Sequence, residues 1–572
     1  MSIPPKRWEV APRAPDSHFA KFPDLPPLVV QILYNRGFTE SQEVRNFLAH
    51  HWAENDPFAL QGMAEAVERL SHAIRRQQPI AIYGDYDADG VTATALMMQV
   101  LTGLGAKVRP YIPDRFDEGY GLNNEALEKL AAEGVALVLT VDCGIRSVKE
   151  VAHANSLGLD LIITDHHSVG EQIPPALATI NPKQKSCTYP FEELAGVGLA
   201  FKLAQALLQA DELIRSGNGA IPREEELLDL VALGTVADLA PLYGENRKLV
   251  AGGLERLNRH PLRLGLAALR DKVGLKRDIT AGTIGFTIGP RLNAAGRLDS
   301  AIAAYELLVA DNELKAVHLA GLLDQQNKER QALTAKMVDF VRLEVLADDG
   351  QQPLYLVSHP DFNPGVVGLA ASRLTEEFYR PTLVAEQGPE FTKGSARSIR
   401  EFHITEALDQ CADLLERYGG HAAAAGFTLK NENVPALRER LCDIAARHLE
   451  VTQLRPTLSI DGEVNLRGVK PALIEAITAL QPFGYGNTTP CFISRNLQVK
   501  AKRALGQDQQ HLRLTLHDGR QAWSAIAFRQ GAWAEKLALD AHIDVVYNLE
   551  FNEWNGRRQM QLNLKDLRLS QA

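Results

Sequence analysis

Apolar and polar positions follow two different patterns along the first third of the chain. Four short apolar runs, rich in β-branched side chains and bounded by polar clusters, predict buried strands. These runs cover residues 79–83, 107–112, 136–141 and 161–164. An amphipathic helix is predicted from Met63, before the first run, and further helices are predicted between the runs, from Val91 and over 123–132 and 147–157. Strands that alternate with helices in this way indicate a doubly wound parallel sheet of the α/β class.

The rest of the chain predicts further kinds of segment. Residues 183–300 have a mostly helical pattern, and residues 311–346, nearly free of Gly and Pro, predict a long connecting helix. A second α/β unit is predicted over residues 353–450. Short alternating runs within residues 511–528 predict a small C-terminal β-barrel or sandwich. Residues 1–60 are Pro-rich, then helical, carry no catalytic pattern, and are interpreted as a docking cap.

Composition places the chain among ordinary globular proteins. Hydrophobic residues make up 45% and charged residues 23% of the 572 positions, which is ample for packed cores. The five cysteines include no Cys-x-x-Cys pair, which fits a reduced cytoplasm and excludes a zinc ribbon. No apolar run reaches about 18 residues and the N-terminus lacks an apolar signal core, so we expect a cytoplasmic protein without a membrane span. The net charge of −10 gives no overall attraction to nucleic acid, so such binding would need local basic patches.

Metal-competent side chains follow three of the predicted strands. Asp85, Asp87 and Asp89 come after the first strand, Asp142 after the third, and Asp165-His166-His167 after the fourth. Open α/β sheets place their ligands at the carboxyl ends of the strands, so these clusters should lie at one sheet edge. Side chains two apart in an extended segment point the same way, so the first three carboxylates are expected to converge.

Each cluster also has an interpretation without chemistry. The acidic run is compatible with a solvated turn, Asp142 with a helix cap, and Asp165-His166-His167 alone with a surface turn. Asp238 lies in an apolar segment, where a charge must be paired or bound to metal, and a core salt bridge is the alternative. Gly90, just before a predicted helix, would let a phosphate approach the helix N-terminus.

Taken together, the carboxylates and one imidazole form a candidate two-metal set. Oxygen-rich sites with one or two imidazoles suit Mn²⁺ or Mg²⁺ better than structural zinc. Two such ions about 3.5–4 Å apart would lower the pKa of a bridging water and clamp a phosphoryl group. His166 and His167 are adjacent and should point in different directions, so we assign His166 to metal and His167 to the substrate phosphate. The candidate ligands are Asp87, Asp89, Asp142, His166 and Asp238, and His167 completes the candidate catalytic set.

These motifs, in this order, resemble those of the DHH phosphoesterase superfamily. The motifs are Asp87-x-Asp89-Gly90, Asp142, Asp165-His166-His167 and Asp238. Gly419-Gly420-His421 and the following Gly426-Phe427 resemble the DHHA1-type substrate domain. The β-rich tail narrows the likeness to the bacterial single-strand-specific exonucleases of this superfamily. The resemblance covers nearly everything from Met63 to Ala572.

The resemblance implies a metal-dependent 5′→3′ exonuclease that hydrolyses single-stranded DNA to mononucleotides, in DNA repair and recombination, with two Mn²⁺ or Mg²⁺ ions. It gives Asp85, Asp165 and His167 positions around the metal ligands. Relatives outside the exonucleases often have a histidine before the first aspartate pair, where this chain has Tyr83-Gly84-Asp85, so Asp85 is a further candidate ligand. The implied domains are an N-terminal helical cap (1–60), a DHH catalytic domain with a helical extension (61–310), a connecting helix (311–350), a DHHA1-like substrate-binding domain (351–452) and an OB-type single-strand-binding barrel (453–572).

Three segments predicted as loops carry residues suited to a nucleic acid strand: 113–121, 291–297 and 395–398. Arg forks and Ser hydroxyls suit phosphate oxygens. Individually each is more readily a surface charge, and His421 a core histidine, but as a set in loops they favour binding. By resemblance, the candidate substrate-binding residues are Arg115, Arg291, Asn293, Arg297, Ser395, Arg397 and His421.

The tail differs in charge from the rest of the chain. Residues 491–572 contain 12 Lys and Arg against 8 Asp and Glu, a net of +4, which leaves −14 for the remainder. Basic residues interleaved with aromatic ones suit an OB-type groove in which bases stack on rings, although we expect at least half of the rings to be barrel core. The aromatic residues are Trp523, Phe528, Trp533, Tyr547, Phe551 and Trp554.

Three other functions compete with a single-strand exonuclease. A DHH enzyme for short oligoribonucleotides or cyclic dinucleotides would not need the long basic tail. A haloacid-dehalogenase phosphatase, with Asp87 as nucleophile, would not need Asp165-His166-His167. A non-enzymatic scaffold on a decayed site is disfavoured because no motif position has lost its side chain. Single-stranded DNA is the expected partner, with a single-strand-binding protein and a helicase as candidate protein partners of a monomer.

Overall fold

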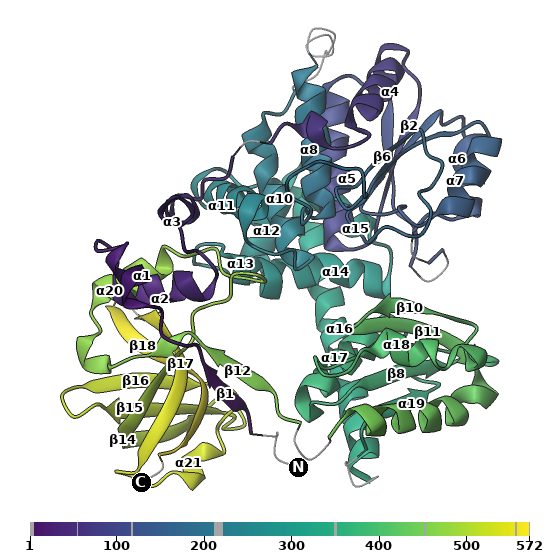
Figure 1. The fold of residues 1–572 in the computed structure, drawn as a ribbon. Coiled ribbons are helices and arrows are strands. Elements are labelled where there is room, and N and C mark those ends of the chain that lie inside the picture. The colour runs from purple at the N-terminus through teal and green to yellow at the C-terminus, as the bar shows by residue number, and fades with distance from the viewer. Residues whose placement is uncertain are drawn as a thin grey trace. The chain divides into compact units, whose positions relative to one another are not determined.

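The computed structural model describes residues 5–53, 55–115, 118–119, 121–210, 221–347, 352–450, 454–554 and 557–570 (Figure 1). The chain divides into two compact units, which are described separately. Unit 1 contains Met1–Pro5, Glu54–Ala240 and Leu249–Arg455. Unit 2 contains Lys6–Ala53, Pro241–Lys248 and Pro456–Ala572. The finer division into five domains stays a prediction.

Unit 1 contains a five-stranded parallel sheet in the order β3-β2-β4-β5-β6. Its strands are β2 (Ile80–Gly84), β3 (Val108–Tyr111), β4 (Leu137–Val141), β5 (Asp160–Thr164) and β6 (Ala178–Ile180). The apolar runs predict β2, β4 and β5 well because helices cover both faces of a parallel sheet and leave few polar positions. The chain leaves β2 toward β3 on one side and returns to β4 on the other, so the topological switch point lies between β2 and β4.

Helices cover this sheet on both sides (Figure 1). α6 (Asn124–Ala132) and α7 (Val148–Ser156) pack on the face that carries Tyr83 and Val138. The other face carries α4 (Met63–Arg75), α5 (Ala88–Gly103) and α8 (Gly196–Gln209), with the short η1 (Pro57–Ala59) beside α4. The doubly wound α/β fold expected from the sequence is therefore confirmed.

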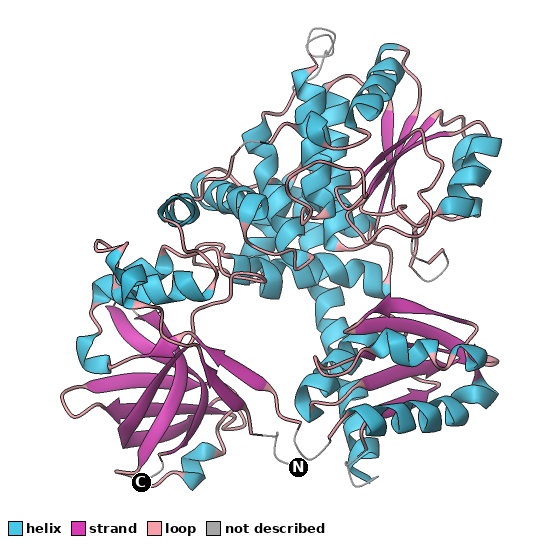
Figure 2. Cartoon of the chain, viewed as in Figure 1, coloured by secondary structure: helices cyan, strands magenta, loops and turns pink. Residues whose placement is uncertain are grey.

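A helical layer follows the sheet, as the pattern over 183–300 predicts (Figure 2). It consists of α10 (Glu224–Ala237), α11 (Gly244–Arg259), α12 (Leu264–Lys272), α13 (Ala281–Thr283), η2 (Ile284–Ile288), α14 (Gly289–Leu298), α15 (Ile302–Leu308) and α16 (Glu313–Ala347). α16 is the predicted long helix, at 35 residues. The expected loop at 291–297 is wrong, because these residues form α14. Gly296 suggested a loop, but a Cβ there would lie 2.5 Å from the Tyr86 carbonyl oxygen, so the glycine serves close packing.

The second α/β part of unit 1 is a mixed sheet in the order β10-β11-β9-β8-β7, in which β7 and β8 are parallel. Its elements are β7 (Tyr355–His359), α17 (Val367–Phe378), β8 (Thr382–Gln387), β9 (Phe391–Arg397), α18 (Ile404–Asp409), η3 (Ala412–Leu414), β10 (Arg417–His421), β11 (Ala424–Lys430), η4 (Asn431–Asn433) and α19 (Val434–His448). The loop expected at 395–398 is wrong, because Ser395 and Arg397 lie in β9. Gly394 is needed inside that strand, where a Cβ would lie 2.5 Å from the ring of Phe427.

Unit 2 is a closed five-stranded β-barrel covered by the N-terminal helices. The barrel strands are β14 (Phe492–Leu505), β15 (His511–His517), β16 (Ala522–Ala527), β18 (Arg557–Leu569) and β17 (His542–Trp554), and the pairing of β14 with β17 closes the ring. The other elements are β1 (Arg7–Val10), α1 (Asp16–Ala20), α2 (Pro27–Asn35), α3 (Ser41–Leu48), β12 (Thr457–Ile460), β13 (Gly462–Glu463), η5 (Leu466–Gly468), α20 (Pro471–Thr478) and α21 (Trp533–Lys536). Ile32 and Phe47 share a hydrophobic core with Leu514 and Trp523, so the N-terminal segment packs on the barrel. The expected OB-type barrel is confirmed.

Candidate active site

The carboxyl ends of β2, β4 and β5 bring the aspartates and histidines together at the switch point. Asp85 follows β2, Asp142 follows β4, and Asp165-His166-His167 follow β5. Asp142 has a φ of 66°, a left-handed backbone that residues other than glycine rarely adopt and that often marks a functional site. Asp238 joins them from the C-cap of α10. The structure therefore gathers the side chains that the sequence singled out.

Asp87 and Asp89 reach the cluster from the start of helix α5. Asp87 is its N-cap, and its Oδ1 accepts hydrogen bonds from the N–H groups of Asp89 (2.9 Å) and Gly90 (3.1 Å). Asp89 lies in the first turn and accepts hydrogen bonds from the N–H groups of Gly196 (2.7 Å) and Val197 (2.9 Å) at the start of α8. The extended alternation expected through Asp89 is wrong, because the helix has already begun there.

Three glycines leave the space that these carboxylates occupy. A Cβ at Gly90 would lie 2.5 Å from the Asp85 carbonyl oxygen, so this buried glycine lets α5 approach the end of β2. Gly90 thus serves close packing, and the approach of a phosphate to this helix N-terminus stays a prediction. A Cβ at Gly196 would lie 2.6 Å from Oδ1 of Asp142, and one at Gly234 would meet Asp89 Oδ1 at 2.7 Å. Sequence reasoning missed Gly196 and Gly234, whose only signal was a glycine inside an apolar helical segment.

His166 points its Nε2 atom into the carboxylates. This atom lies 3.1 Å from Oδ1 of Asp142, 3.7 Å from Oδ2 of Asp238 and 3.9 Å from Oδ2 of Asp89. Burial and the neighbouring charge of His167 lower the pKa of His166 to about 3, so its imidazole is neutral and offers a lone pair. Within the described part of the chain, Nε2 of His166 and Oδ1 of Asp142 are buried without a hydrogen-bond partner. Two such orphaned atoms facing each other fit ligands that share a cation.

The whole donor set fits divalent cations. Three groups have ligand atoms within 4.8 Å of one another: Asp142, His166 and His167; Asp89, His166 and Asp238; and Asp85, Asp87 and Asp142. Burial and neighbouring carboxylates raise the pKa of Asp142 well above its usual range and that of Asp238 to about 9. Carboxylates that are costly together in a buried site are stabilised by bound cations. Oxygen donors with one or two imidazoles suit Mn²⁺ and Mg²⁺, and Asp85 belongs to the donor set.

His167 has a different partner from His166. Its Nδ1 lies 2.7 Å from Oδ1 of Asp165, which also accepts the His167 backbone N–H at 3.0 Å. Oδ2 of Asp165 accepts the N–H of Ile145 at 2.9 Å, which fixes the carboxylate. Burial alone would lower the pKa of His167, but the hydrogen bond and charge of Asp165 outweigh it and raise that pKa to about 9. His167 is therefore a fixed cation at neutral pH.

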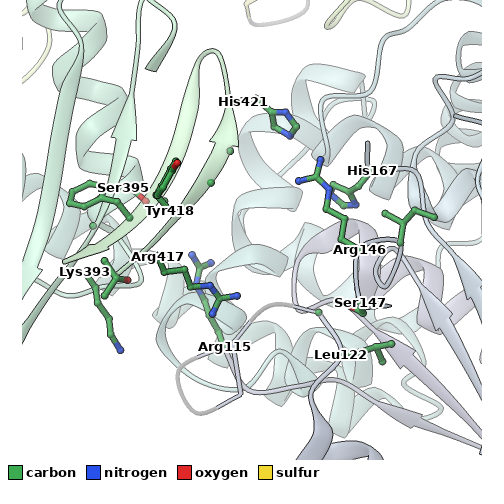
Figure 3. A pocket seen from close by; sticks show the side chains of 18 of the residues that line it. Arg115, Leu122, Arg146, Ser147, His167, Lys393, Ser395, Arg417, Tyr418 and His421 are labelled. Carbon is green, nitrogen blue, oxygen red and sulfur yellow. The ribbon is translucent and has the colours of Figure 1, made fainter. Parts of the chain in front are cut away.

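A cleft of about 820 Å³ opens beside the cluster, lined by segments that follow strands of the parallel sheet and by residues of the mixed sheet of unit 1 (Figure 3). Figure 3 shows Arg146 and His167 on one wall near His421, and Arg115 close to Arg417. Asp165, one of the two carboxylate residues in its lining, is bound to His167. Its cationic lining residues are Arg115, Arg146, Lys393 and Arg417, with His167 and His421. The cleft therefore suits a polyanion.

The structure separates the seven residues expected to bind substrate. Arg115, Ser395 and His421 line the cleft. Arg291 is instead paired with Asp324 of α16 at 3.0 Å, which ties two helices together. Asn293 accepts the N–H of Ala88 at 2.7 Å and so positions the start of α5. Arg297 and Arg397 are not among the described residues that line the cleft. Burial, and to a smaller extent the charge of Arg115, lowers the pKa of both guanidinium groups, that of Arg297 to about 10.

Sequence reasoning missed three of the cationic lining residues. Arg146 lies just after Cys143-Gly144, close to the end of the predicted strand 136–141, and this closeness to a strand end could have identified it as a site residue. Lys393 and Arg417 lie on strands β9 and β10, near the glycines that drew attention to this region. Only the pairing of β9, β11 and β10 places them on one wall.

Most aromatic residues of the barrel are structural. Trp523 and Tyr547 are buried, and Trp533 and Phe551 pack partly buried against the core. Phe528 is 55% exposed and available for stacking. The side chain of Trp554 lies outside the described residues. The expectation that at least half of these rings belong to the core is confirmed.

The fold and the site define a phosphoesterase of the DHH class, and family models match three of its parts. The DHH family N-terminal domain matches residues 79–235, the DHHA1 domain residues 350–447 and the RecJ OB domain residues 460–566. The chain belongs to the RecJ family. No helix in the described ranges is long and apolar enough to cross a membrane.

Relatives and solved structures match over nearly the full chain. It is 42% identical over 574 residues to the single-stranded-DNA-specific exonuclease RecJ of Bacillus subtilis (strain 168), covering 99% of this chain and 71% of that protein. The crystal structure of RecJ from Thermus thermophilus in complex with Mn²⁺ matches with a TM-score of 0.83 and 32% identity, over 99% of this chain and 80% of that one. The corresponding Mg²⁺ complex matches with a TM-score of 0.78 and 31% identity, over 99% and 79%. These are the two metals that the donor set suits.

Proposed function

We propose that this protein is a metal-dependent exonuclease that degrades single-stranded DNA from the 5′ end to mononucleotides, in DNA repair and recombination. One observation carries the proposal: a buried carboxylate–imidazole cluster opens on a cleft with cationic walls. Metal-assisted hydrolysis of a polynucleotide uses both features, metal ligands near the reacting phosphorus and cations for the flanking phosphates. The names of the RecJ relatives support single-stranded DNA as the substrate, and the 5′ polarity rests on the family resemblance.

Two divalent ions, Mn²⁺ or Mg²⁺, are the proposed cofactors. When bound, such ions supply Lewis acidity toward water and the phosphoryl oxygens. Asp142 and His166 each belong to two of the three donor groups among the described residues, so both would take part in holding the ions. The residues that would hold the ions are Asp85, Asp87, Asp89, Asp142, His166 and Asp238.

His167 and the cleft residues act on the strand itself. His167 carries its proton at neutral pH and donates a hydrogen bond to a phosphate oxygen, and Asp165 maintains that charge. Arg115 and Ser395 hold backbone or terminal phosphates, and His421 approaches from the second sheet. We expect the cleft, of about 820 Å³, to admit single strands in preference to a duplex.

The remaining expectations concern where the protein acts and with what. We propose a cytoplasmic monomer that binds single-stranded DNA also through its barrel, where Phe528 is exposed and the tail carries a net charge of +4. A single-strand-binding protein and a helicase are its proposed protein partners. Co-sedimentation of this protein with each of the two proposed partners, with and without DNA, tests these interactions directly.

The decisive experiment uses 5′-labelled single strands and blunt duplexes with Mg²⁺ or Mn²⁺, for the wild type and Asp142→Ala. Labelled mononucleotides should appear first from single strands and be lost in the variant. Equal rates on both substrates would show that the protein does not select single strands. Cleavage confined to dinucleotides or short oligoribonucleotides would favour the rival DHH activity, and no cleavage of DNA or RNA with Mn²⁺ would favour a scaffold.

A further inference from the structure

Unit 2 contains a cavity of about 410 Å³ that the proposed function does not use. Three segments that are distant in the sequence line it: residues within 36–52, residues within 243–248, and Gly486–Asn487. All three belong to unit 2, and none carries a metal-ligand candidate. Its volume falls within the range of about 300–1,000 Å³ that small-molecule sites occupy. The cavity is therefore large enough for a ligand of its own.

Two arginines of this lining, Arg36 and Arg247, have no carboxylate partner among the described residues. Arg247 is 2% exposed, and its guanidinium donates to backbone carbonyl oxygens at 2.6–3.4 Å. Arg36 donates to a backbone carbonyl oxygen at 2.6 Å. Neither forms an ion pair with a carboxylate of the described residues, although the charge of Asp461 acts on Arg36. Lys248 also lines the cavity, and Glu43 is the one carboxylate residue in the described lining. An anion would offset this excess of positive charge.

Unsatisfied polar atoms in the lining point to the same conclusion. Nη1 of Arg36, Nδ1 of His50 and Oδ1 of Asn487 are buried without a hydrogen-bond partner among the described residues. Asn487 is 1% exposed, and its amide N–H groups already donate to the carbonyl oxygens of Leu480 and Pro482. It therefore has one acceptor left for a ligand N–H group. Buried polar atoms are nearly always paired, so a ligand with anionic oxygens and an N–H donor would complete the site.

Aromatic rings form the remaining walls. Phe38 and Phe47 pack with their centroids 4.6 Å apart, and Arg247 stacks 3.8 Å from the centroid of Phe47. These three groups are fixed by one another. Trp52 is partly exposed and Tyr243 is 40% exposed, so both can cover a flat ligand. Such rings accept a nucleobase of any sequence by stacking.

We infer that this cavity binds one nucleotide. Arg36 and Lys248 hold its phosphate, Trp52 and Tyr243 cover its base, and Oδ1 of Asn487 accepts a hydrogen bond from the exocyclic amine. Adenine, cytosine and guanine carry that amine, whereas thymine offers only a ring N3–H between two carbonyl oxygens that would face Oδ1 of Asn487, so the site prefers the first three. The ligand is either a free mononucleotide or one residue of a longer strand, because both present the same phosphate and base.

Binding to the full chain in the presence of a chelator tests this inference without hydrolysis. Calorimetry with 5′-dAMP, 5′-dTMP and a dT 13-mer with one central dA should show tighter binding of the adenine-containing ligands. Arg36→Gln should weaken binding at least about tenfold, because a charged hydrogen bond to phosphate is lost. Arg45→Gln is the matched control, since Arg45 is an exposed residue of α3 that contacts Gln42 and does not line the cavity.

Tyr243→Ala provides a second variant at an exposed position and should weaken binding about fivefold or more through lost stacking. 8-Azido-dAMP should label peptides that contain Trp52 or Tyr243. If the two variants lose affinity for the mononucleotide, the ligand is a free nucleotide. If they lose affinity for the 13-mer alone, the ligand is a strand. Both variants binding like the control, or labelling confined to unit 1, would overturn the inference.

Two further outcomes are separable. If a peptide of alternating Asp and Phe binds in an Arg36-dependent manner and nucleotides do not, the cavity is a peptide site and the inference is wrong. Because the binding assay needs no turnover, a failure of the proposed exonuclease activity would leave its result unaffected.

Discussion

Gly196→Ala tests whether the position of Asp142 controls activity. The added Cβ would lie 2.6 Å from both Cβ and Oδ1 of Asp142. Reaching the 3.4 Å of ordinary contact requires the carboxylate to retreat by about 0.8 Å. Asp142 has little freedom to adjust, because its backbone is held at a φ of 66°. A misplacement of about 1 Å can cost about 100-fold in rate, or roughly 2.7 kcal/mol, so we expect a loss of that size in kcat.

The assay is single-turnover release of mononucleotides from a 5′-labelled single strand with Mn²⁺, together with Mn²⁺ affinity by calorimetry. Gly321→Ala is the control, because a Cβ at Gly321, inside α16, meets nothing within 4 Å. That variant should keep full activity and gain up to about 1 kcal/mol in stability. Gly196→Ala with activity and Mn²⁺ affinity within twofold of wild type would refute the reasoning.

Three further predictions follow from charges in unit 1. Burial and its acidic neighbours raise the pKa of Asp142 above its value in the unfolded chain, so its ionised form destabilises the fold as pH rises. Asp142→Asn should therefore have a higher melting temperature than wild type in chelator, a smaller rise in melting temperature with Mn²⁺, and no activity. An unchanged melting profile would contradict this. His167 should lose its proton as pH rises through about 9, and kcat/KM should fall with it. Asp165→Asn removes the group that raises this pKa, so the fall of kcat/KM should move to lower pH. A fall at the same pH in the variant would contradict the role of the Asp165–His167 pair. Arg417→Ala should raise KM for single strands and reduce by about 1 the slope of log binding constant against log salt concentration. Arg438→Ala is the control, because Arg438 is an exposed residue of α19 outside the cleft, and it should change neither quantity. Equal effects of the two variants would exclude a specific role for Arg417.

The sequence alone determined the strand–helix order and the chemistry at the strand ends. Burial of β2, β4 and β5 on both faces leaves apolar runs that any reader of the chain can see, and parallel strands must end at one edge. That topology is why the sequence assigns Asp142 and His166 to one site. Alternation in the tail predicted a small β-barrel or a sandwich, and the pairing of β14 with β17 decides for the closed barrel.

Tertiary structure alone decided which residues serve the site by position. Arg146, Lys393 and Arg417 line the cleft because two sheets face it, while Arg291 is bound to Asp324 on another helix. Glycines that looked like loop signals turned out to permit close packing inside helices and strands. The division of labour between His166, neutral among carboxylates, and His167, charged beside Asp165, depends on distances of a few ångströms. Burial and electrostatics act through space, so two adjacent histidines differ in charge, one neutral and one positive, and their order along the chain cannot assign which is which.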